Sequence, residues 1–451
     1  MSKRTVHLAA HFPGVNNTTI WNDEKAGSQI SFDSFRHFAQ TAERGRFDYL
    51  FLAEGLRLRE HRGRIHDLDV VGRPNTLAIL GAIASITEHI GLVGTLSSTF
   101  NEPYELARQL ATLDHVSGGR AGWNIVTSSD SFHGANFRRG GFLDRADRYT
   151  RAEEFLEVAR KLWESWAVDA VTADRTRGEF LAENALTEVD HHGRHFDVTG
   201  FATLPRSPQV QPVIVQAGDS ADGRDFAARS AEVIFSAHSD FDKARAFFSD
   251  VKGRFAEVGR EPDSLKILPG ATFILGDSAA DAQERSREIA LLQVSPQTAI
   301  GFLEQVWGTD LSNYDVDGPL PDFDPVIDEI APRGRANAVT DPIAVSRGWR
   351  AKAEAENLSI RQLVITFAAK HTFVGTPSFV ASEIDRYVQA EASDGFVIVG
   401  HSNPTGLDEF VDSVIPELQE RGVYRTEYEP GATLRENLGL PALERSFATL
   451  A

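Results

Sequence analysis

The sequence predicts an α/β protein, and within this class a (β/α)8 TIM barrel with a long insertion between its seventh and eighth strands. Short apolar segments alternate with amphipathic segments of helical period, which implies parallel strands joined by helices. Eight such alternations are present, and 451 residues are enough for one barrel with insertions. An open, doubly wound sheet is the structural alternative.

The eight predicted strands are short runs rich in apolar and β-branched residues. They lie at 6–10, 49–53, 90–95, 121–126, 213–217, 233–237, 267–275 and 396–400. Between them, apolar residues recur every three or four positions, the spacing that places side chains on one face of a helix. In the first predicted helix, at 32–44, these residues are Phe35, Phe38, Ala39 and Ala42.

The other predicted helices follow the same pattern. The second starts at Pro74 and the third near Pro103, because proline is favoured in the first turn of a helix. A helix at 149–166 carries Phe155, Ala159, Leu162 and Trp166 three or four positions apart, and a closing helix runs from about 408 to 421.

Two segments are longer than ordinary connections between elements. The first, 168–211, looks irregular. Its histidines, His191, His192 and His195, have no further partner in sequence, and they are too weak a pattern to predict a metal site.

The second long segment, 280–380, is predicted to be a helical excursion that folds over the barrel mouth. It includes the Pro- and Asp-rich run NYDVDGPLPDFDP at 313–325. We expect the insertion to form a lid or an oligomer surface, within a single domain that spans 1–451.

Composition excludes several classes of function. Lys and Arg total 46 against 65 Asp and Glu, a net charge of −19, which argues against general binding to nucleic acid or to an anionic membrane. No cysteine is present, so disulfides and thiolate chemistry are excluded. The first residues do not resemble a signal peptide, and no apolar run is long enough to span a bilayer. These features fit a cytoplasmic protein.

Hydroxyl side chains gather where the third and fourth strands end. Thr95 ends the third strand, and Thr127, Ser128 and Ser129 follow the fourth. A hydroxyl at a strand end can be a simple turn former. Because the carboxyl ends of barrel strands share one rim, these residues also suit a shared polar or anionic ligand. Glu54, which ends the second strand, is either a ligand contact on this rim or a solvated charge.

The fifth strand ends in Gln-Ala-Gly-Asp-Ser and leads directly into a helix. Gly218 allows a tight turn, and Ser220 can cap the helix through its hydroxyl. The free amides and the positive end of the helix dipole favour a phosphate there, although an ordinary helix cap has the same sequence. Arg224, nearby, is either a surface charge or a phosphate clamp.

Several cofactor motifs are absent. The chain has no P-loop, no Gly-x-Gly-x-x-Gly after a strand, no Gly-x-Ser-x-Gly and no His-Glu-x-x-His. A redox enzyme without a dinucleotide fingerprint needs a mononucleotide cofactor or a cofactor delivered from elsewhere.

Six motifs, taken together, resemble the flavin-dependent monooxygenases of the bacterial luciferase-like superfamily. More narrowly, they are similar to the group that contains the nitrilotriacetate, EDTA, dibenzothiophene-sulfone and long-chain alkane monooxygenases. The motifs are FDYLFLAEGL at 47–56, STFNEPYELARQLATLDHVSGGRAGWNIVTS at 98–128, NF…DRYTRAEEFLEV at 136–158, SPQVQPVIVQAGDSADGRDFAARSAEVIF at 207–235, VGTPSFVASEI at 374–384 and IPELQERGVYRTEYEPGATLRENLGL at 415–440. They cover essentially the whole chain in order.

The resemblance implies a TIM-type barrel and a two-component monooxygenase. Reduced FMN would be a diffusible co-substrate supplied by a separate NAD(P)H:flavin reductase. It would react with O2 to give a C4a-peroxyflavin that transfers one oxygen atom to a small organic substrate. The implied assembly is a homodimer or homotetramer. Two alternatives remain open, a deazaflavin (F420) oxidoreductase and a non-catalytic flavin-binding barrel.

The resemblance also implies roles for particular residues. Flavin contacts fall on Glu54, Thr95, Asn124, Ser128, Ser129, Arg145, Tyr149, Gly218 and Ser220. Ser220 would meet the phosphate, Tyr149 would lie near it, and Asn124 would face the barrel interior near the ring. Apart from the resemblance, His11 and His133 are candidates for the proton that the departing oxygen atom needs, because they lie at or near strand ends or rim loops. Relatives usually have Asp in place of Glu54, and many have His in place of Arg145.

Overall fold

The computed structural model describes residues 3–14, 16, 18–24, 26–58, 60–61, 64–65, 72–128, 134–137, 147–326 and 341–443. Eight parallel strands form a closed barrel, because β12 and β13 join the two sides of the sheet. In barrel order they are β1 (His7–Phe12), β2 (Tyr49–Leu52), β5 (Gly91–Ser97), β6 (Ala121–Val126), β11 (Val213–Gln216), β12 (Val233–Ser236), β13 (Lys266–Leu275) and β15 (Gly395–Val399). The predicted barrel is confirmed, and the open sheet is excluded.

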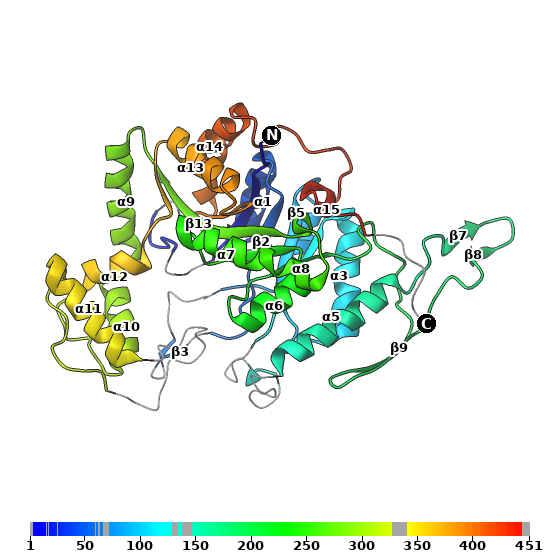
Figure 1. The fold of residues 1–451 in the computed structure, drawn as a ribbon, viewed down its shortest axis with the longest axis horizontal. Helices are drawn as coiled ribbons and strands as arrows, with labels where there is room; N and C mark the ends of the chain where they lie inside the picture. The colour runs from blue at the N-terminus through cyan, green and yellow to red at the C-terminus, as the bar shows by residue number, and fades with distance from the viewer. Residues whose placement is uncertain are drawn as a thin grey trace.

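Helices surround the barrel (Figure 1). They are α1 (Phe32–Arg44), α2 (Thr76–Ala84), α3 (Pro103–Ser117), α5 (Arg148–Glu164), α6 (Ala221–Ser230), α7 (Phe241–Gly253), α8 (Phe255–Val258), α13 (Pro377–Gln389) and α14 (Asp408–Glu420). The predicted apolar face of α1 is buried. Helix α2 starts two residues later than predicted, because the side chain of Asn75, and not Pro74, provides its cap by accepting from Ala78 N.

The barrel is closed at the amino ends of its strands. The short helix α15 (Leu434–Asn437) inserts Leu434 into the interior cluster that contains Val93, Val213 and Val397. Gly91 and Gly122 leave room for this leucine, since a Cβ at either position would meet its side chain. A ligand can therefore enter only from the carboxyl ends of the strands, which we call the mouth. We call the side of the strands that faces this cluster the interior of the barrel.

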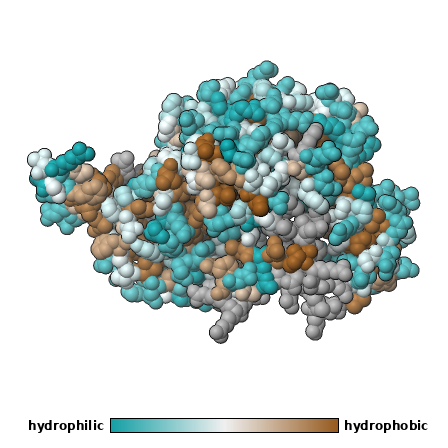
Figure 2. Space-filling view, turned by 180° about the vertical axis from the view of Figure 1, so that it is seen from behind, coloured by the Kyte–Doolittle hydropathy of each residue, from teal (hydrophilic) through white to brown (hydrophobic). Residues whose placement is uncertain are grey.

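The segment 168–211 is not irregular, so this part of the prediction was wrong. It forms two antiparallel hairpins, one of β7 (Val171–Asp174) with β8 (Glu179–Leu181) and one of β9 (Val189–His192) with β10 (Asp197–Gly200). In Figure 1 the β7–β8 hairpin projects from the body. Figure 2, from behind, shows hydrophobic side chains on this projection, where Val171, Phe180 and Leu181 are exposed.

The histidines predicted not to bind a metal lie in and beside the β9–β10 hairpin. His191 lies 3.2 Å from Glu154 Oε1, His192 lies 3.0 Å from Asp197 Oδ1, and His195 Nε2 lies 3.1 Å from the Thr150 hydroxyl. The three histidines therefore have three different partners. Within the described ranges, no group of three or more potential ligands comes together to hold a metal ion.

Helices α9 (Ala279–Gln293), α10 (Pro296–Trp307), α11 (Pro342–Glu356) and α12 (Ile360–Ala368) occupy the insertion, and β14 (Phe373–Gly375) extends the sheet beside β13. The last three helices form a lobe with its own core at the left of Figure 1. The run at 313–325 belongs to this core, since Trp307 Nε1 donates to Phe323 O at 3.0 Å. Residues 327–340 lie outside the described part.

The remaining elements are short. They are β3 (Glu60–His61), β4 (Arg64–Ile65) and the 3-10 turns Pro262–Ser264 and Thr405–Leu407. Among the described helices, none combines the length and the apolar character that a membrane span requires.

Candidate flavin site

The interior wall of the mouth carries two polar side chains on neighbouring strands. Val93 packs in the barrel interior, so Thr95, two residues further along β5, points the same way. Trp123 and Ile125 pack outside the barrel, so Asn124 between them points inward. Thr95 and Asn124 are register partners, and Asn124 Nδ2 donates to Thr95 Oγ1 at 2.9 Å.

This hydrogen bond fixes the orientation of the Asn124 amide. Its Oδ1 atom is buried and has no hydrogen-bond partner among the described residues. Buried carbonyl oxygens are almost always paired in folded proteins, so an unpaired one facing a ligand site calls for an N–H donor. Asn124 therefore fits a ligand that brings such a donor into the mouth.

A second polar chain links β2, β5 and the residues after β6. The Ser97 hydroxyl lies 3.0 Å from the Ser128 hydroxyl, and Ser97 N donates to Glu54 Oε2 at 3.1 Å. The predicted residues Glu54 and Ser128 are thus joined through Ser97. Sequence reasoning missed Ser97, although its spacing of two residues from Thr95 was the signal that both face the mouth.

The predicted phosphate corner brings together residues far apart in the chain. Ser220 caps α6 by accepting from Gly223 N at 3.1 Å, and the Tyr149 hydroxyl of α5 lies 3.2 Å from Ser220 Oγ. Ser220 itself is exposed. A hydroxyl beside the amino end of a helix is well placed for an anion.

Two glycines allow this corner to close. A Cβ at Gly218 would lie 3.2 Å from Gly223 Cα, and a Cβ at Gly223 would lie 2.9 Å from the Tyr149 hydroxyl oxygen. The turn after β11 and the first turn of α6 therefore lie so close together that a side chain at either glycine would displace its neighbours. Gly218, predicted for its tight turn, is needed for this close approach.

A polar corner, an inward amide and neighbouring hydroxyls at a barrel mouth suit a nucleotide-like cofactor. A model of the luciferase-like monooxygenases matches residues 13–394. The chain belongs to this family. The family resemblance inferred from the sequence is confirmed.

Named relatives cover nearly the whole chain. An N-acetyl-S-(2-succino)cysteine monooxygenase of Bacillus subtilis (strain 168) is 40% identical, over 97% of this chain and 97% of that protein. Nitrilotriacetate monooxygenase component A of Aminobacter aminovorans is 40% identical, over 92% and 91%. The solved structure of DmoA from Hyphomicrobium sulfonivorans superposes with a TM-score of 0.80 at 30% identity, over 97% of this chain and 92% of that chain.

These relatives make the chain a flavin-dependent monooxygenase of the two-component type. The names of two relatives describe each of them as one part of a larger enzyme system. The first is the nitrilotriacetate enzyme's component, and the second is a subunit of the pristinamycin IIA synthase of Streptomyces pristinaespiralis, 38% identical over 455 residues. The predicted enzyme class and the need for a second component agree with this.

Glu54 has an unusual environment for a carboxylate in this monooxygenase. Burial raises the pKa of its carboxyl to about 7, and the single hydrogen bond from Ser97 N opposes this only in part. The Arg73 guanidinium donates at 3.4 Å to the main-chain oxygen of Glu54. The burial of Glu54 therefore favours the protonated form of its carboxyl.

His11 points into the interior, two residues beyond Ala9. Its ring lies between Phe51 and Phe235, with centroids 5.2 and 6.4 Å away. Burial first, and then the charge of Arg73, lower its pKa to about 4. Because Nδ1 must donate to Phe51 O, at 3.2 Å, Nε2 of the neutral ring can only accept a hydrogen bond.

Arg224 is held by carboxylates. Its Nη2 lies 2.9 Å from Asp219 Oδ1, and its Nη1 lies 2.8 Å from Asp250 Oδ2. Both ends of the guanidinium are thus occupied by carboxylates in this structure. Ser129, His133 and Arg145, which were also predicted for the site, lie outside the described residues.

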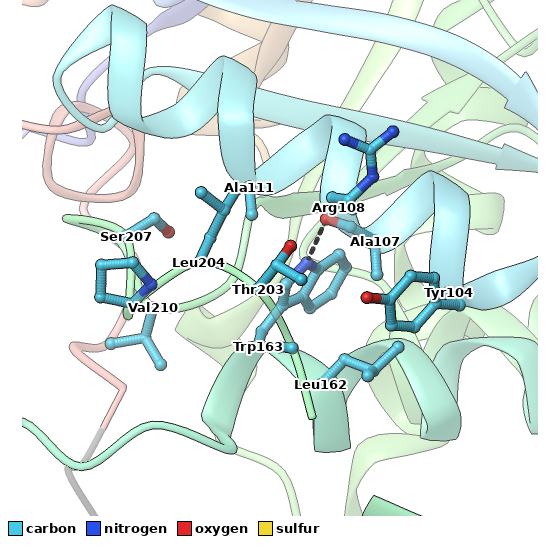
Figure 3. A pocket seen from close by; sticks show the side chains of 12 residues that line it. Tyr104, Ala107, Arg108, Ala111, Leu162, Trp163, Thr203, Leu204, Ser207 and Val210 are labelled. Atoms are coloured by element: carbon cyan, nitrogen blue, oxygen red, sulfur yellow. Dashed lines mark hydrogen bonds between the residues drawn. The ribbon is translucent and has the colours of Figure 1, made fainter. Parts of the chain in front are cut away.

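A separate hollow lies outside the barrel, between α3 and α5 under the segment 202–210. Figure 3 shows the Trp163 indole at its centre, donating to Ala107 O at 2.9 Å. The cavity volume is only about 20 Å3, room for about one water molecule. It is lined mostly by apolar side chains, and it is too small to hold a flavin.

Proposed function

We propose that this chain is the oxygenase component of a two-component system and uses reduced FMN as a co-substrate. A separate NAD(P)H:flavin reductase supplies the reduced flavin, by diffusion or by docking. One atom of O2 enters a small organic substrate and the other leaves as water. The observation that carries this proposal is the corner of Ser220, Tyr149 and the close-packed Gly218 and Gly223 beside the inward-facing Asn124.

The residues present fit the phosphate, the ribityl chain and the ring of FMN. Ser220 and Tyr149 would hold the phosphate at the amino end of α6. Ser128 and Thr95, at the ends of the neighbouring strands, would meet the ribityl chain. Asn124 Oδ1, unpaired among the described residues, would accept from a ring N–H.

Bound reduced flavin would supply two electrons and activate O2 at its C4a position. The protein has to exclude water, because activated oxygen that escapes is lost as peroxide. The insertion is our candidate for this role, together with the loop 129–143, most of which lies outside the described residues. A homodimer or homotetramer remains a prediction.

The names of the relatives support a substrate class. Their names specify a cysteine thioether, an aminopolycarboxylate and a sulfone. We infer a small molecule in which oxygenation occurs at carbon next to nitrogen or sulfur, or at sulfur itself.

The test is a coupled oxygenation assay. The chain is mixed with FMN, NADH, a purified flavin reductase and a panel of thioethers, sulfones, sulfonates, amines and aminopolycarboxylates. We expect an oxygenated product by mass spectrometry, with oxygen uptake that matches product. FMN binding with no product from any class would support the flavin-storage alternative. Cofactor reduction by substrate without oxygen uptake would support the F420-type alternative.

A further inference from the structure

Glu54 occupies a particular position at the mouth. Its carboxylate is fixed at the end of β2 by the backbone N–H of Ser97, whose hydroxyl in turn contacts Ser128. The carboxyl therefore lies against the part of the barrel wall that carries the Ser97 and Ser128 hydroxyls. No ion pair between this carboxylate and a basic side chain is seen among the described residues, and Arg73 donates at 3.4 Å to the main-chain oxygen of Glu54.

This environment favours the protonated form of the carboxyl. A partly buried carboxylate needs a cation or several N–H donors to compensate for lost hydration, and Glu54 receives one N–H. Burial accordingly raises its pKa to about 7. An acid with a pKa near the working pH transfers a proton most effectively, because it is protonated and can also release the proton.

Among the described residues, His11 is another titratable group on the interior wall, and its environment favours this role less than that of Glu54 does. Its only ring proton at neutral pH is on Nδ1, which donates to Phe51 O. Burial and Arg73 keep its pKa near 4, so the imidazolium is not populated where Glu54 is half protonated. Tyr49, lower in the barrel, has its pKa raised by burial and by Asp48, so its hydroxyl does not release a proton near neutral pH.

We propose that Glu54 is the proton donor of the oxygenation reaction and delivers its proton to the oxygen atom that leaves as water. This inference depends on the proposed function. Reduced FMN as its monoanion, one proton, O2 and the substrate become FMN, the oxygenated substrate and water. O2 takes two electrons from the flavin and two from the substrate. The Glu54 carboxylate then regains a proton from solvent.

The first test needs neither flavin nor substrate. Infrared difference titration of the full chain should show a protonated carboxyl that ionises with a midpoint near pH 7 and is missing in Glu54→Gln. Glutamine keeps an oxygen that can accept from Ser97 N, so the fold should be retained. Glu105→Gln, on the exposed face of α3, removes a carboxylate whose pKa is lowered by Arg108, and it should leave the signal unchanged. A Glu54 carboxyl that is already ionised at pH 5 would overturn the proposal.

The second test measures coupling. At saturating FMN, Glu54→Gln should oxygenate the substrate about 10²-fold more slowly, and it should therefore give less product per reduced flavin with a matching rise in peroxide. The wild-type yield should fall as pH rises through about 7, and the small yield of Glu54→Gln should not depend on pH in this range. Glu54→Asp should restore part of the yield.

The two proposals fail in different ways. If the wild type gives no oxygenated product from any substrate class, the proposed function is wrong. If the wild type gives product and Glu54→Gln gives the same yield, the proposed function stands and the assignment of Glu54 is refuted.

Discussion

Replacing Ser220 by alanine tests the phosphate corner. The change removes two interactions of different kinds. The hydroxyl caps α6 through Gly223 N, and loss of a helix cap lowers the free energy of unfolding by about 1 kcal/mol. The same hydroxyl is our candidate donor to the phosphate, and a hydrogen bond to a charged group contributes about 1.5–3 kcal/mol.

The second quantity determines the expected change in affinity. Since about 1.4 kcal/mol corresponds to a factor of ten, the dissociation constant for FMN should rise about 10- to 150-fold. Fluorescence titration measures it for oxidised FMN, and anaerobic titration measures it for reduced FMN. Thermal unfolding of the same samples measures the cost of the lost cap.

Ser278→Ala is the matched control. Ser278 is also exposed, and it caps α9 by accepting from Asp281 N at 3.1 Å, but it lies outside the predicted flavin site. We expect the same loss of thermal stability and an unchanged affinity for FMN. If the two variants bind FMN equally well, Ser220 does not contact the phosphate and the site assignment is refuted.

Three further substitutions test single contacts. Thr95→Val leaves the buried Asn124 Nδ2 without its partner, and it should lower the free energy of unfolding, measured in urea, by about 1–3 kcal/mol. The control, Thr112→Val on the exposed face of α3, should change this free energy by less than about 0.5 kcal/mol. Gly223→Ala places a Cβ 2.9 Å from the Tyr149 hydroxyl and should weaken FMN binding in the same titration, whereas Gly253→Ala, with no atom within 4 Å of its Cβ, should bind FMN normally. Because the pKa of Glu54 is raised from 4.5 to about 7 on folding, its contribution to stability is fully present below about pH 4.5 and is lost as pH rises through about 7. The free energy of unfolding should therefore fall less between pH 5 and pH 8 in Glu54→Gln than in the wild type. An equal fall in both proteins would contradict a raised pKa for Glu54.

The barrel was predictable because its strands are buried and short. Each is a nearly continuous apolar run, and every predicted strand end lies within two residues of the observed one. The hairpins of 168–211 were not predictable in this way, because they lie outside the barrel and only one face of β9 is buried. Strands of four residues with few buried positions carry too little pattern to be recognised.

The sequence predicted which residues belong to the candidate site, but it did not predict the hydrogen bonds and ion pairs that connect them. A strand-end serine such as Ser128 is visible in a sequence, but its contact with Ser97 depends on the register of β5 and β6. The role of Arg224 was undecided, because Asp250, its second partner, comes from α7. The shifted pKa of Glu54 results from burial in the folded mouth, which no local pattern encodes.

The composition of the phosphate corner bears on how the flavin is used. Among the described residues, the corner consists of two hydroxyls, the amino end of a helix and the Arg148 guanidinium, which lies 4.8 Å from the centroid of the Tyr149 ring. Arg224 is already held by Asp219 and Asp250. A helix terminus contributes about 0.3–1 kcal/mol at an exposed site, which is less than a bidentate guanidinium contributes. Such an anchor would orient the phosphate, and Arg145, predicted for the same site, lies outside the described residues. We expect a flavin that enters reduced and leaves oxidised in each turnover to be bound through these contacts, without Arg224.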